Sequence, residues 1–407
     1  MKHILICPDS FKGTLTSLQA AECIREGLRE VLGNDCEYRI QPIADGGEGT
    51  VDAVLYGRKG QRHSSPVRNP LREEIMAEYG VMENTAVIEM AASSGLCLIS
   101  EKERDPLNAT TFGVGQQIKE ALSLQVKKII IGIGGSATND GGIGMAGALG
   151  VRFLNESGEE LSAYQGPQIL DNLASVDISN LDPRIAKTEI VVFSDVENPL
   201  LGPRGATTVY GPQKGVTDIA KFEKLLSHLR EVVERDLGKD MNAIVGGGAA
   251  GGLGAGLAVF LNAHMTSGIE MIAKLTDLHS QIKKADIVIT GEGCMDDQTS
   301  FGKAPAFIAK LTKKYGKTAY ALNGFLKSAP DTFNLAWGTN SLPNFDAKNV
   351  SKNALPLLRL LSKRLAQEKI FPTMKQITPR QIGKSILLVP FPKMLIKYFV
   401  MGGWTSK

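Results

Sequence analysis

The sequence predicts an α/β protein with two domains and a ligand-binding cleft between them. At both ends of the chain, short apolar runs typical of strands alternate with segments of helical apolar spacing, which favours a parallel sheet. The middle of the chain has strands and a glycine-rich loop of its own. The length of 407 residues is enough for two cores. We therefore expect a discontinuous parallel-sheet domain (1–60 plus 281–370), an inserted mixed α/β domain (61–280) and an atypical basic tail (371–407).

The first domain opens with an expected strand at 4–7, which Pro8 ends. The loop that follows carries Ser10 and Lys12, and Thr16 or Ser17 is placed to cap the next helix. A second strand at 38–43 leads into a loop with Asp45 and Glu48. Ligands bind beyond the carboxyl ends of strands in parallel α/β sheets, so we expect both loops to face one crevice.

The remaining elements follow from the same patterns. Apolar runs predict strands at 85–90, 129–131, 151–154, 190–193, 287–290 and 317–322. Apolar residues at helical spacing predict helices over about 217–237 and 357–365. Residues 68–71 are typical of a turn between two strands.

Residues 129–150 are the most informative stretch. A buried-strand pattern leads into Gly134, Gly135 and Ser136, and a helix of small residues follows. Glycines let backbone N–H groups approach an anion, and a helix N-terminus adds partial positive charge. The pattern indicates a phosphate site, with Asp140 placed to hold a cation. Close packing of helix on sheet is the alternative explanation for such glycines.

A dinucleotide site is a further alternative for this stretch. Gly132, Gly134 and Ala137 satisfy the fingerprint G-x-G-x-x-G/A, and Glu156 lies near the spacing of a ribose-binding acid. That fingerprint would predict an NAD(P)-dependent oxidoreductase of a small hydroxy acid. The same fingerprint also matches at 142–147 and at 246–251, so it discriminates poorly.

Carboxylates near glycines or strand ends recur along the chain, with cations close by. They are Asp9, Asp45, Glu48, Asp140, Asp195, Glu197, Glu292 and Asp296, beside Lys12, Arg204, Lys214 and Lys303. Phosphoryl transfer needs this combination, because carboxylates hold Mg²⁺ and accept a hydroxyl proton while cations neutralise phosphate oxygens. There is no Walker P-loop or protein-kinase motif. The residues alone therefore favour a small-molecule kinase of unfamiliar type.

Composition excludes several classes of protein. A net charge of +3 gives no support for nucleic-acid binding, and no apolar run approaches the roughly 18 residues of a membrane span. The five cysteines lack metal-ligand spacing, which fits a reducing compartment. The N-terminal apolar run is too short for a signal peptide. We expect a cytoplasmic protein and leave a homodimer open.

Six stretches together resemble the glycerate kinase family of bacterial type I. They are 7–15 (CPDSFKGTL), 42–50 (PIADGGEGT), 132–142 (GIGGSATNDGG), 194–200 (SDVENPL), 211–215 (GPQKG), and 291–293 (GEG) followed by Asp296, Gln298, Thr299 and 302–305 (GKAP). They span about 320 residues in the family's order.

The resemblance implies ATP-dependent phosphorylation of glycerate with Mg²⁺, in organic acid and glyoxylate–glycerate metabolism. In this type the product is generally 2-phosphoglycerate. The family fold has two α/β domains, one flavodoxin-like and one resembling restriction endonucleases. Glycerate and ATP are the expected partners.

Residue roles are our inference within that framework. Ser10 and Lys12 are placed at the carboxylate of glycerate, with Glu48 and Lys303 as further substrate-binding residues. Asp45, Asp195 and Asp296 are candidates for base or metal ligand, with Asp195 preferred as base. The ATP phosphates are assigned to Gly134, Gly135, Ser136, Thr138, Asn139 and Lys214, and the metal to Asp140 and Asp195.

The chain departs from the family after about Leu322, where a glycine-containing loop, a strand and a closing helix are expected. From Asp331 onward, 12 Lys and Arg stand against 3 Asp and Glu, a balance of +9. A frame change in the gene or a divergent extension would explain this tail. If the closing strand and helix are missing, the first domain is expected to be less stable or inactive, leaving a nucleotide- or sugar-acid-binding module.

Overall fold

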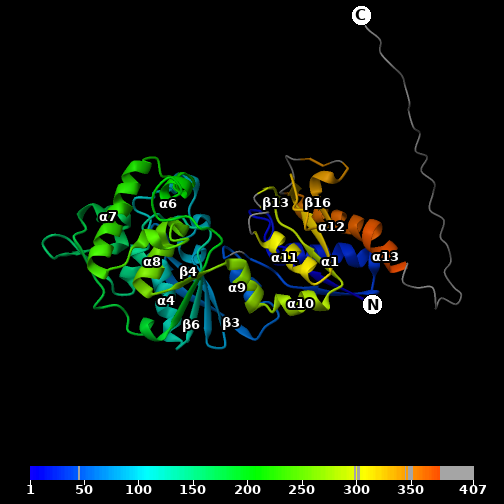
Figure 1. Ribbon diagram of the computed structural model, residues 1–407, viewed down its shortest axis with the longest axis horizontal. Coiled ribbons are helices and arrows are strands. Elements are labelled where there is room, and N and C mark those ends of the chain that lie inside the picture. Colours follow the sequence, from blue (N-terminus) through cyan, green and yellow to red (C-terminus); the bar gives the residue numbers. More distant parts are fainter. Residues whose placement is uncertain (45, 298, 300–302, 344, 347–351, 376–407) are drawn as a thin grey trace, which may run out of the picture.

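Two main β-sheets form the frame of the protein (Figure 1). A computed structural model describes residues 1–375, apart from 45, 298, 300–302, 344 and 347–351. Each sheet carries its own covering helices, and a further layer of helices lies between the sheets. The predicted α/β class with parallel strands is confirmed.

The first sheet has five parallel strands in the order β16-β14-β12-β1-β2. The strands are β1 (Lys2–Ile6), β2 (Cys36–Ile40), β12 (Ile287–Thr290), β14 (Thr318–Asn323) and β16 (Leu335–Gly338). Strand β1 pairs with β2 on one side and with the central strand β12, from late in the chain, on the other. The sheet therefore joins the two ends of the sequence.

The second sheet has six strands in the order β11-β10-β6-β5-β4-β3. The strands are β3 (Gly60–Arg68), β4 (Glu74–Met82), β5 (Thr85–Glu89), β6 (Lys128–Gly132), β10 (Glu189–Phe193) and β11 (His264–Thr266). Strands β5, β6, β10 and β11 are parallel, whereas β4 runs antiparallel to both its neighbours. Ile129, Ile130 and Ile131 are fully buried in central β6, as the β-branched run predicts.

Helices α1 (Ser17–Leu32) and α12 (Ala354–Leu365) cover one face of the first sheet and lie side by side (Figure 1). Thr16 caps α1 in a capping box with Gln19. Gly27 allows the two helices to approach closely, since a Cβ at this position would lie only 2.6 Å from the Arg359 carbonyl oxygen. Arg359 and Lys363 form ion pairs with acidic residues of α1. The C-terminal helix is thus a built part of this core.

The layer between the sheets is shared by both of them. It contains α2 (Thr50–Leu55), α9 (Gly268–Leu275), α10 (Leu278–Lys284) and α11 (Ala304–Lys314). Leu5 and Val288 of the first sheet and Ile130 and Val191 of the second belong to this one apolar cluster. This core belongs to both sheets and does not mark where one domain ends and the other begins. The domain boundaries at 60/61 and 280/281 therefore stay predictions.

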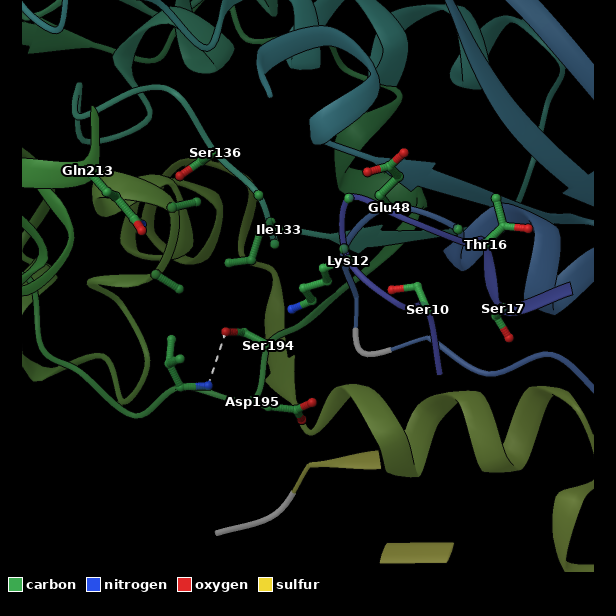
Figure 2. Close-up of a pocket in the computed structure, with 18 of the residues that line it drawn as sticks. Ser10, Lys12, Thr16, Ser17, Glu48, Ile133, Ser136, Ser194, Asp195 and Gln213 are labelled. Atoms are coloured by element: carbon green, nitrogen blue, oxygen red, sulfur yellow. Dashed lines mark hydrogen bonds between the residues drawn. The ribbon is translucent and has the colours of Figure 1, made fainter. Parts of the chain in front are cut away.

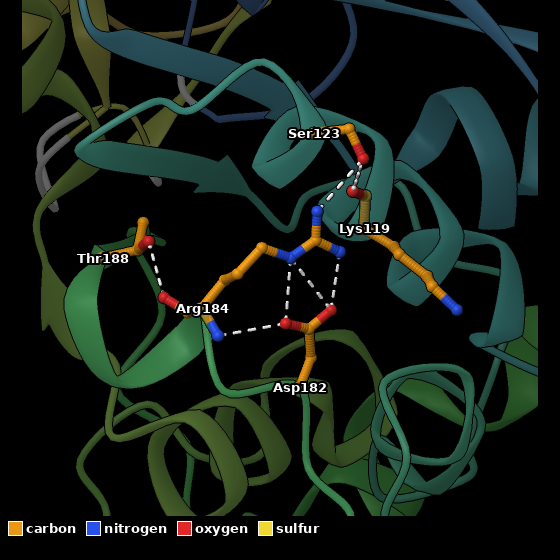
Figure 3. A network of polar contacts seen from close by, with 5 residues as sticks. All are labelled: Lys119, Ser123, Asp182, Arg184 and Thr188. Carbon is orange, nitrogen blue, oxygen red and sulfur yellow. Dashed lines mark hydrogen bonds and ion pairs between the residues drawn. The ribbon is translucent and has the colours of Figure 1, made fainter.

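The other face of the six-stranded sheet is covered by α4 (Phe112–Ser123), α5 (Ile143–Ala148), α7 (Ile219–Leu237) and α8 (Leu253–Leu261). A small antiparallel sheet of β7 (Arg152–Leu154), β8 (Glu160–Leu161) and β9 (Ser175–Asp177) extends this core. The Arg184 guanidinium pairs with Asp182 at 2.6 Å and donates to Ser123 Oγ at 3.2 Å (Figure 3). This network ties the end of α4 to the segment that enters β10.

The remaining α-helices and β-strands are short. They are α3 (Ala91–Ser94), α6 (Ala206–Tyr210), β13 (Cys294–Met295), β15 (Phe325–Leu326) and α13 (Phe371–Lys375). Within the described ranges, no helix has both the length and the apolar character to cross a bilayer.

The structure corrects the expectation for the chain after Leu322. That segment supplies a strand, β16, which pairs with β14, and a helix, α12, which packs on α1. The closing strand and helix are therefore present, and part of the basic surplus serves the ion pairs with α1. The predicted tail is helical at 371–375, and the rest of it lies outside the described residues.

Candidate active site

A cavity of about 700 Å³ lies between the loops that follow β1 and β2 on one side and β6 and β10 on the other (Figure 2). The carboxyl ends of strands from both sheets meet here, as parallel α/β topology predicts. Eight of the residues predicted from the sequence line it: Ser10, Lys12, Glu48, Gly134, Gly135, Ser136, Asp195 and Lys214.

The loop after β1 presents Lys12 to the cavity. Phe11 is buried and its backbone N–H bonds the Leu15 carbonyl at 2.9 Å, so the loop doubles back over itself. Gly13 takes φ +74°, which a side-chain-bearing residue rarely adopts. Lys12 is exposed, and Figure 2 shows its amino group directed toward the loop that carries Ser194. An exposed lysine side chain therefore extends into the cavity.

Two glycine-rich loops pack directly on one another beside the cavity. The Gly134 N–H donates to the Gly46 carbonyl at 3.1 Å. A Cβ at Gly132 would lie 2.3 Å from that same oxygen, and one at Gly134 would lie 2.8 Å from Gly47 Cα. Close backbone packing thus accounts for Gly132 and Gly134, the alternative that the sequence left open. Gly135, at φ +76° on the cavity wall, supplies the turn itself.

Lys214 lies in the cavity wall opposite Lys12 and is fully buried. Its ammonium donates to Ser136 Oγ and to the Thr138 carbonyl, each at 2.7 Å. Burial lowers the pKa of Lys214 to about 7, and the nearby Asp140 acts in the opposite direction. The side chain is therefore fixed in place, and an anion that enters the cavity would stabilise its charged form.

Asp140, which the sequence assigns to the metal, lies behind the cavity wall among hydrogen-bond donors. It is fully buried and absent from the cavity lining. Its carboxylate accepts hydrogen bonds from the N–H and hydroxyl of Thr111 and from the N–H groups of Gly142 and Gly144. These contacts make Asp140 the anchor that fixes the glycine loop to the start of α4 and α5.

Thr138 and Asn139 also lie behind the cavity wall. Both are fully buried and neither lines the cavity. The Asn139 amide donates to Thr207 Oγ1 at 2.9 Å, while Thr138 contributes its carbonyl to Lys214. The sequence assigned both residues to the ATP phosphates, but the loop turns both side chains inward, away from the cavity.

Asp195 lies at the cavity where β10 ends. Its Oδ1 accepts the Gly268 N–H at 2.8 Å and the Ser267 hydroxyl at 3.2 Å. The carboxylate thus also holds the beginning of α9 (Figure 2). Its neighbour Ser194 lines the cavity and bonds the Val196 N–H at 3.4 Å.

Asp296 and Lys303 form a separate cluster, outside the cavity lining. The Lys303 ammonium lies 3.8 Å from Asp296 and 3.7 Å from Glu292. Glu292 is buried, accepts the Thr299 hydroxyl at 2.7 Å, and has its pKa raised chiefly by burial. Lys12 acts electrostatically on Glu292, so the cluster adjoins the loop of β1. Asp45 falls outside the described residues.

Sequence reasoning missed Tyr210 and Gln213, which line the cavity beside Lys214. Gln213 lies in the stretch 211–215, one of the six that carry the family resemblance, so that stretch could have identified it. Tyr210 bonds Asn198 Oδ1 at 2.8 Å, and no motif pointed to it.

The arrangement suits an anionic substrate together with a phosphate compound. One wall offers the exposed Lys12 and hydroxyls, and the other offers the fixed Lys214 and a glycine turn. The described residues contain no cluster of three His, Cys, Asp or Glu that could hold a metal ion. A Mg²⁺ ion carried by a nucleotide needs only one or two protein carboxylates, since phosphates and water supply the rest, and Asp195 fits that requirement.

Comparisons with known proteins agree with this geometry. The model of the glycerate kinase family matches residues 4–361. A glycerate kinase of Halalkalibacterium halodurans is 48% identical over 330 residues, which cover 80% of this chain and 86% of that protein. A glycerate 2-kinase of Escherichia coli is 43% identical over 327 residues, covering 79% and 85%.

A solved structure shows the same fold. The crystal structure of a Salmonella typhimurium LT2 protein assigned as glycerate kinase 2 is 39% identical, with a TM-score of 0.80. The alignment covers 92% of this chain and 99% of that one. The match of fold, motifs and nearly full length displaces the oxidoreductase alternative. The chain belongs to the glycerate kinase family.

Proposed function

We propose that the protein phosphorylates glycerate with ATP, and that the product is 2-phosphoglycerate. The observation that carries the proposal is the cavity with Lys12 on one wall and the buried Lys214 beside Ser136 on the other. Family membership supports kinase activity, and the name of the Escherichia coli relative supports attack by the 2-hydroxyl.

The nucleotide phosphates are assigned to the wall formed by the loop after β6. Gly135 and Ser136 line the cavity there, and the Lys214 ammonium donates a hydrogen bond to the Ser136 hydroxyl. A cation that is already positioned stabilises charge as it develops on transferring phosphate oxygens, without reorganisation during the reaction. The low folded-state pKa of Lys214 means that phosphate binding is expected to draw a proton onto it.

The carboxylate of glycerate is assigned to Lys12 and Ser10 on the opposite wall, with Glu48 beside them. The exposed ammonium of Lys12 is suited to a small anion that binds and leaves at each turnover. The reacting hydroxyl would then lie between Lys12 and the phosphate wall. Lys303 and Asp296 adjoin this region from the loop after β12, where they would attract glycerate or orient Lys12 through Glu292.

Asp195 is assigned as the group that accepts the hydroxyl proton or holds the metal of MgATP. It stands at the end of β10 on the cavity, and a hydrogen bond to the start of α9 fixes its orientation. Mg²⁺ would supply charge neutralisation at the phosphate oxygens.

Phosphorus NMR tests the proposed reaction directly. Purified protein is incubated with MgATP and D-glycerate, and a new phosphomonoester signal is expected in proportion to ADP. Its coupling to protons distinguishes O2 from O3 as the site of attack. ATP binding without product would instead identify a non-catalytic binding module, and absence of ATP binding would overturn the assignment of the phosphate wall.

Asp195→Asn tests the role of the carboxylate. The amide oxygen can still accept the Gly268 N–H, so the fold is expected to keep its thermal stability. Loss of a proton acceptor is expected to lower kcat about 100-fold or more. Ser267→Ala is the matched control, since it removes one contact of Asp195 without touching its charge. Full turnover in Asp195→Asn would remove this residue from the catalytic assignment.

A further inference from the structure

Helix α2 begins without a cap of its own. Gly49 stands at the N-cap position with φ +90° and offers no side chain. The first N–H groups of a helix have no partner within the helix. Here the acceptor comes from another element, because Glu89 Oε1, at the end of β5, accepts the Val51 N–H at 2.6 Å. The Gly49 N–H also interacts with this carboxylate.

The segment held by Glu89 is the one that forms the cavity wall. Gly47, Glu48 and Gly49 line the cavity directly before α2. The same segment receives the hydrogen bond from Gly134 to Gly46. Glu89 is not in the lining, yet its carboxylate lies behind the loop and the Met90 N–H next to it bonds the Gly132 carbonyl at 2.9 Å. The end of β5 thus contacts both glycine-rich loops, one through the Glu89 side chain and the other through the Met90 backbone.

We propose that Glu89 is a positioning residue that caps α2 and thereby holds Glu48 and the 46–49 loop in place at the cavity, in its ionised form. An ionised carboxylate binds backbone N–H groups more strongly than a neutral one and is favoured at a helix N-terminus. When Glu89 takes up a proton, the loop loosens and substrate binding weakens. The kinetic part of this inference rests on the proposed glycerate phosphorylation.

The surroundings of Glu89 place this change near neutral pH. Burial raises the pKa of Glu89 to about 7, the N–H groups of Val51 and Gly49 oppose the shift, and the negative charges of Asp52 and Glu48 add to it. Asp52 is itself paired with Arg62 of β3. Cys97, in the 3-10 helix Leu96–Leu98, faces both Glu89 and Glu48. Burial raises the pKa of its thiol.

Hydrogen exchange of the backbone amides tests the positioning role without any substrate. In the wild-type protein, the N–H groups of residues 49 and 51 are expected to be about tenfold better protected at pH 8 than at pH 6 after correction for intrinsic rates. In Glu89→Gln their protection is expected to be low at both values. Equal protection in wild type at both pH values would overturn the proposal, even if the variant fails to fold.

Kinetics supply the second readout. For Glu89→Gln, kcat/KM for glycerate is expected to fall about tenfold at pH 8, mainly through KM, and to approach wild type at pH 6. Glu89→Asp keeps a titrating carboxylate and is expected to be intermediate. Glu120→Gln, an exposed change on α4, is the matched control and should leave the profile unchanged.

The two readouts separate this inference from the proposed function. If the wild-type protein phosphorylates no glycerate, the proposed function fails while the exchange experiment still decides the role of Glu89. A pH profile of Glu89→Gln identical to wild type, in an active enzyme, would overturn the positioning role alone.

Discussion

The two lysines on opposite walls of the cavity are held in contrasting ways. Lys12 is exposed on a loop of the first sheet, whereas Lys214 is fully buried in the second and bonded to two oxygens at 2.7 Å. The buried Lys214 amino group is already in position when charge develops, and we expect bound phosphate to keep it protonated, whereas the exposed Lys12 side chain must be ordered by the ligand. We therefore expect the Lys214 wall to serve the chemical step and the Lys12 wall to serve reversible binding.

Lys214→Met is expected to give the largest effect. It removes the fixed cation, and we expect kcat to fall about 100- to 1,000-fold with little change in the KM for glycerate. The free energy of unfolding should change by only about 1–3 kcal/mol, since the Ser136 and Thr138 oxygens lose their donor. Steady-state kinetics and urea unfolding measure the two quantities.

Lys239→Met is the control for that experiment. Lys239 also donates to a buried carbonyl, that of Val259 at 2.7 Å, but does not line the cavity. It should keep normal kcat and, because Lys239 is exposed, lose less stability than Lys214→Met. If both variants lost kcat equally, the special role of Lys214 would be refuted.

Lys12→Met is expected to give an intermediate effect of a different kind. Loss of one charge-assisted contact to a carboxylate should raise the KM for glycerate about 10- to 100-fold with a smaller change in kcat. Because Lys12 is exposed, the free energy of unfolding should stay within about 0.5 kcal/mol of wild type. Lys310→Met, an exposed change on α11, is the matched control. A fall in kcat as large as that of Lys214→Met would erase the distinction between the walls.

The pH dependence of stability is the last test of this contrast. Between pH 7 and 10.5 the unfolded chain keeps a proton on Lys214 that the folded protein has released, so stability rises with pH. Between pH 4.5 and 7 the folded protein keeps a proton on Glu89 that the unfolded chain has released, so stability falls with pH.

Thermal unfolding of Lys214→Met and Glu89→Gln from pH 5 to 10 separates the two contributions. Relative to wild type, Lys214→Met should lose the rise in stability between pH 7 and 10.5. Glu89→Gln should lose the fall in stability between pH 4.5 and 7. If both variants kept the wild-type dependence of stability on pH, this expectation would be refuted.

The strands and the cavity loops were predictable from sequence because their signals are local. The β-branched run at 129–131 marks a buried strand, and the loops after β1, β6 and β10 follow from strand ends. Side-chain direction within a loop was not predictable. Ser136 lines the cavity while Thr138, Asn139 and Asp140, a few positions on, turn into the interior, since only the packed backbone decides which way each one points.

Long-range contacts were the other limit. Glu89 is 38 positions from its partner Val51 and belongs to no motif. Likewise, the helix predicted at 357–365 is confirmed as α12, but its packing on α1 was not predicted, because its cations pair with residues more than 300 positions away. Pairings of that kind appear only when the chain is folded.

The discontinuous first sheet has a consequence for synthesis on the ribosome. Strand β1 leaves the ribosome early, but its neighbour β12 and the helix α12 that packs on α1 are made only after the last strand of the six-stranded sheet. Ile4, Ile6, Ile24 and Leu28 therefore wait without their final partners while the six-stranded sheet is already complete. Exposed apolar surface on a nascent chain promotes aggregation, so we expect the N-terminal segment to depend on chaperones until translation ends.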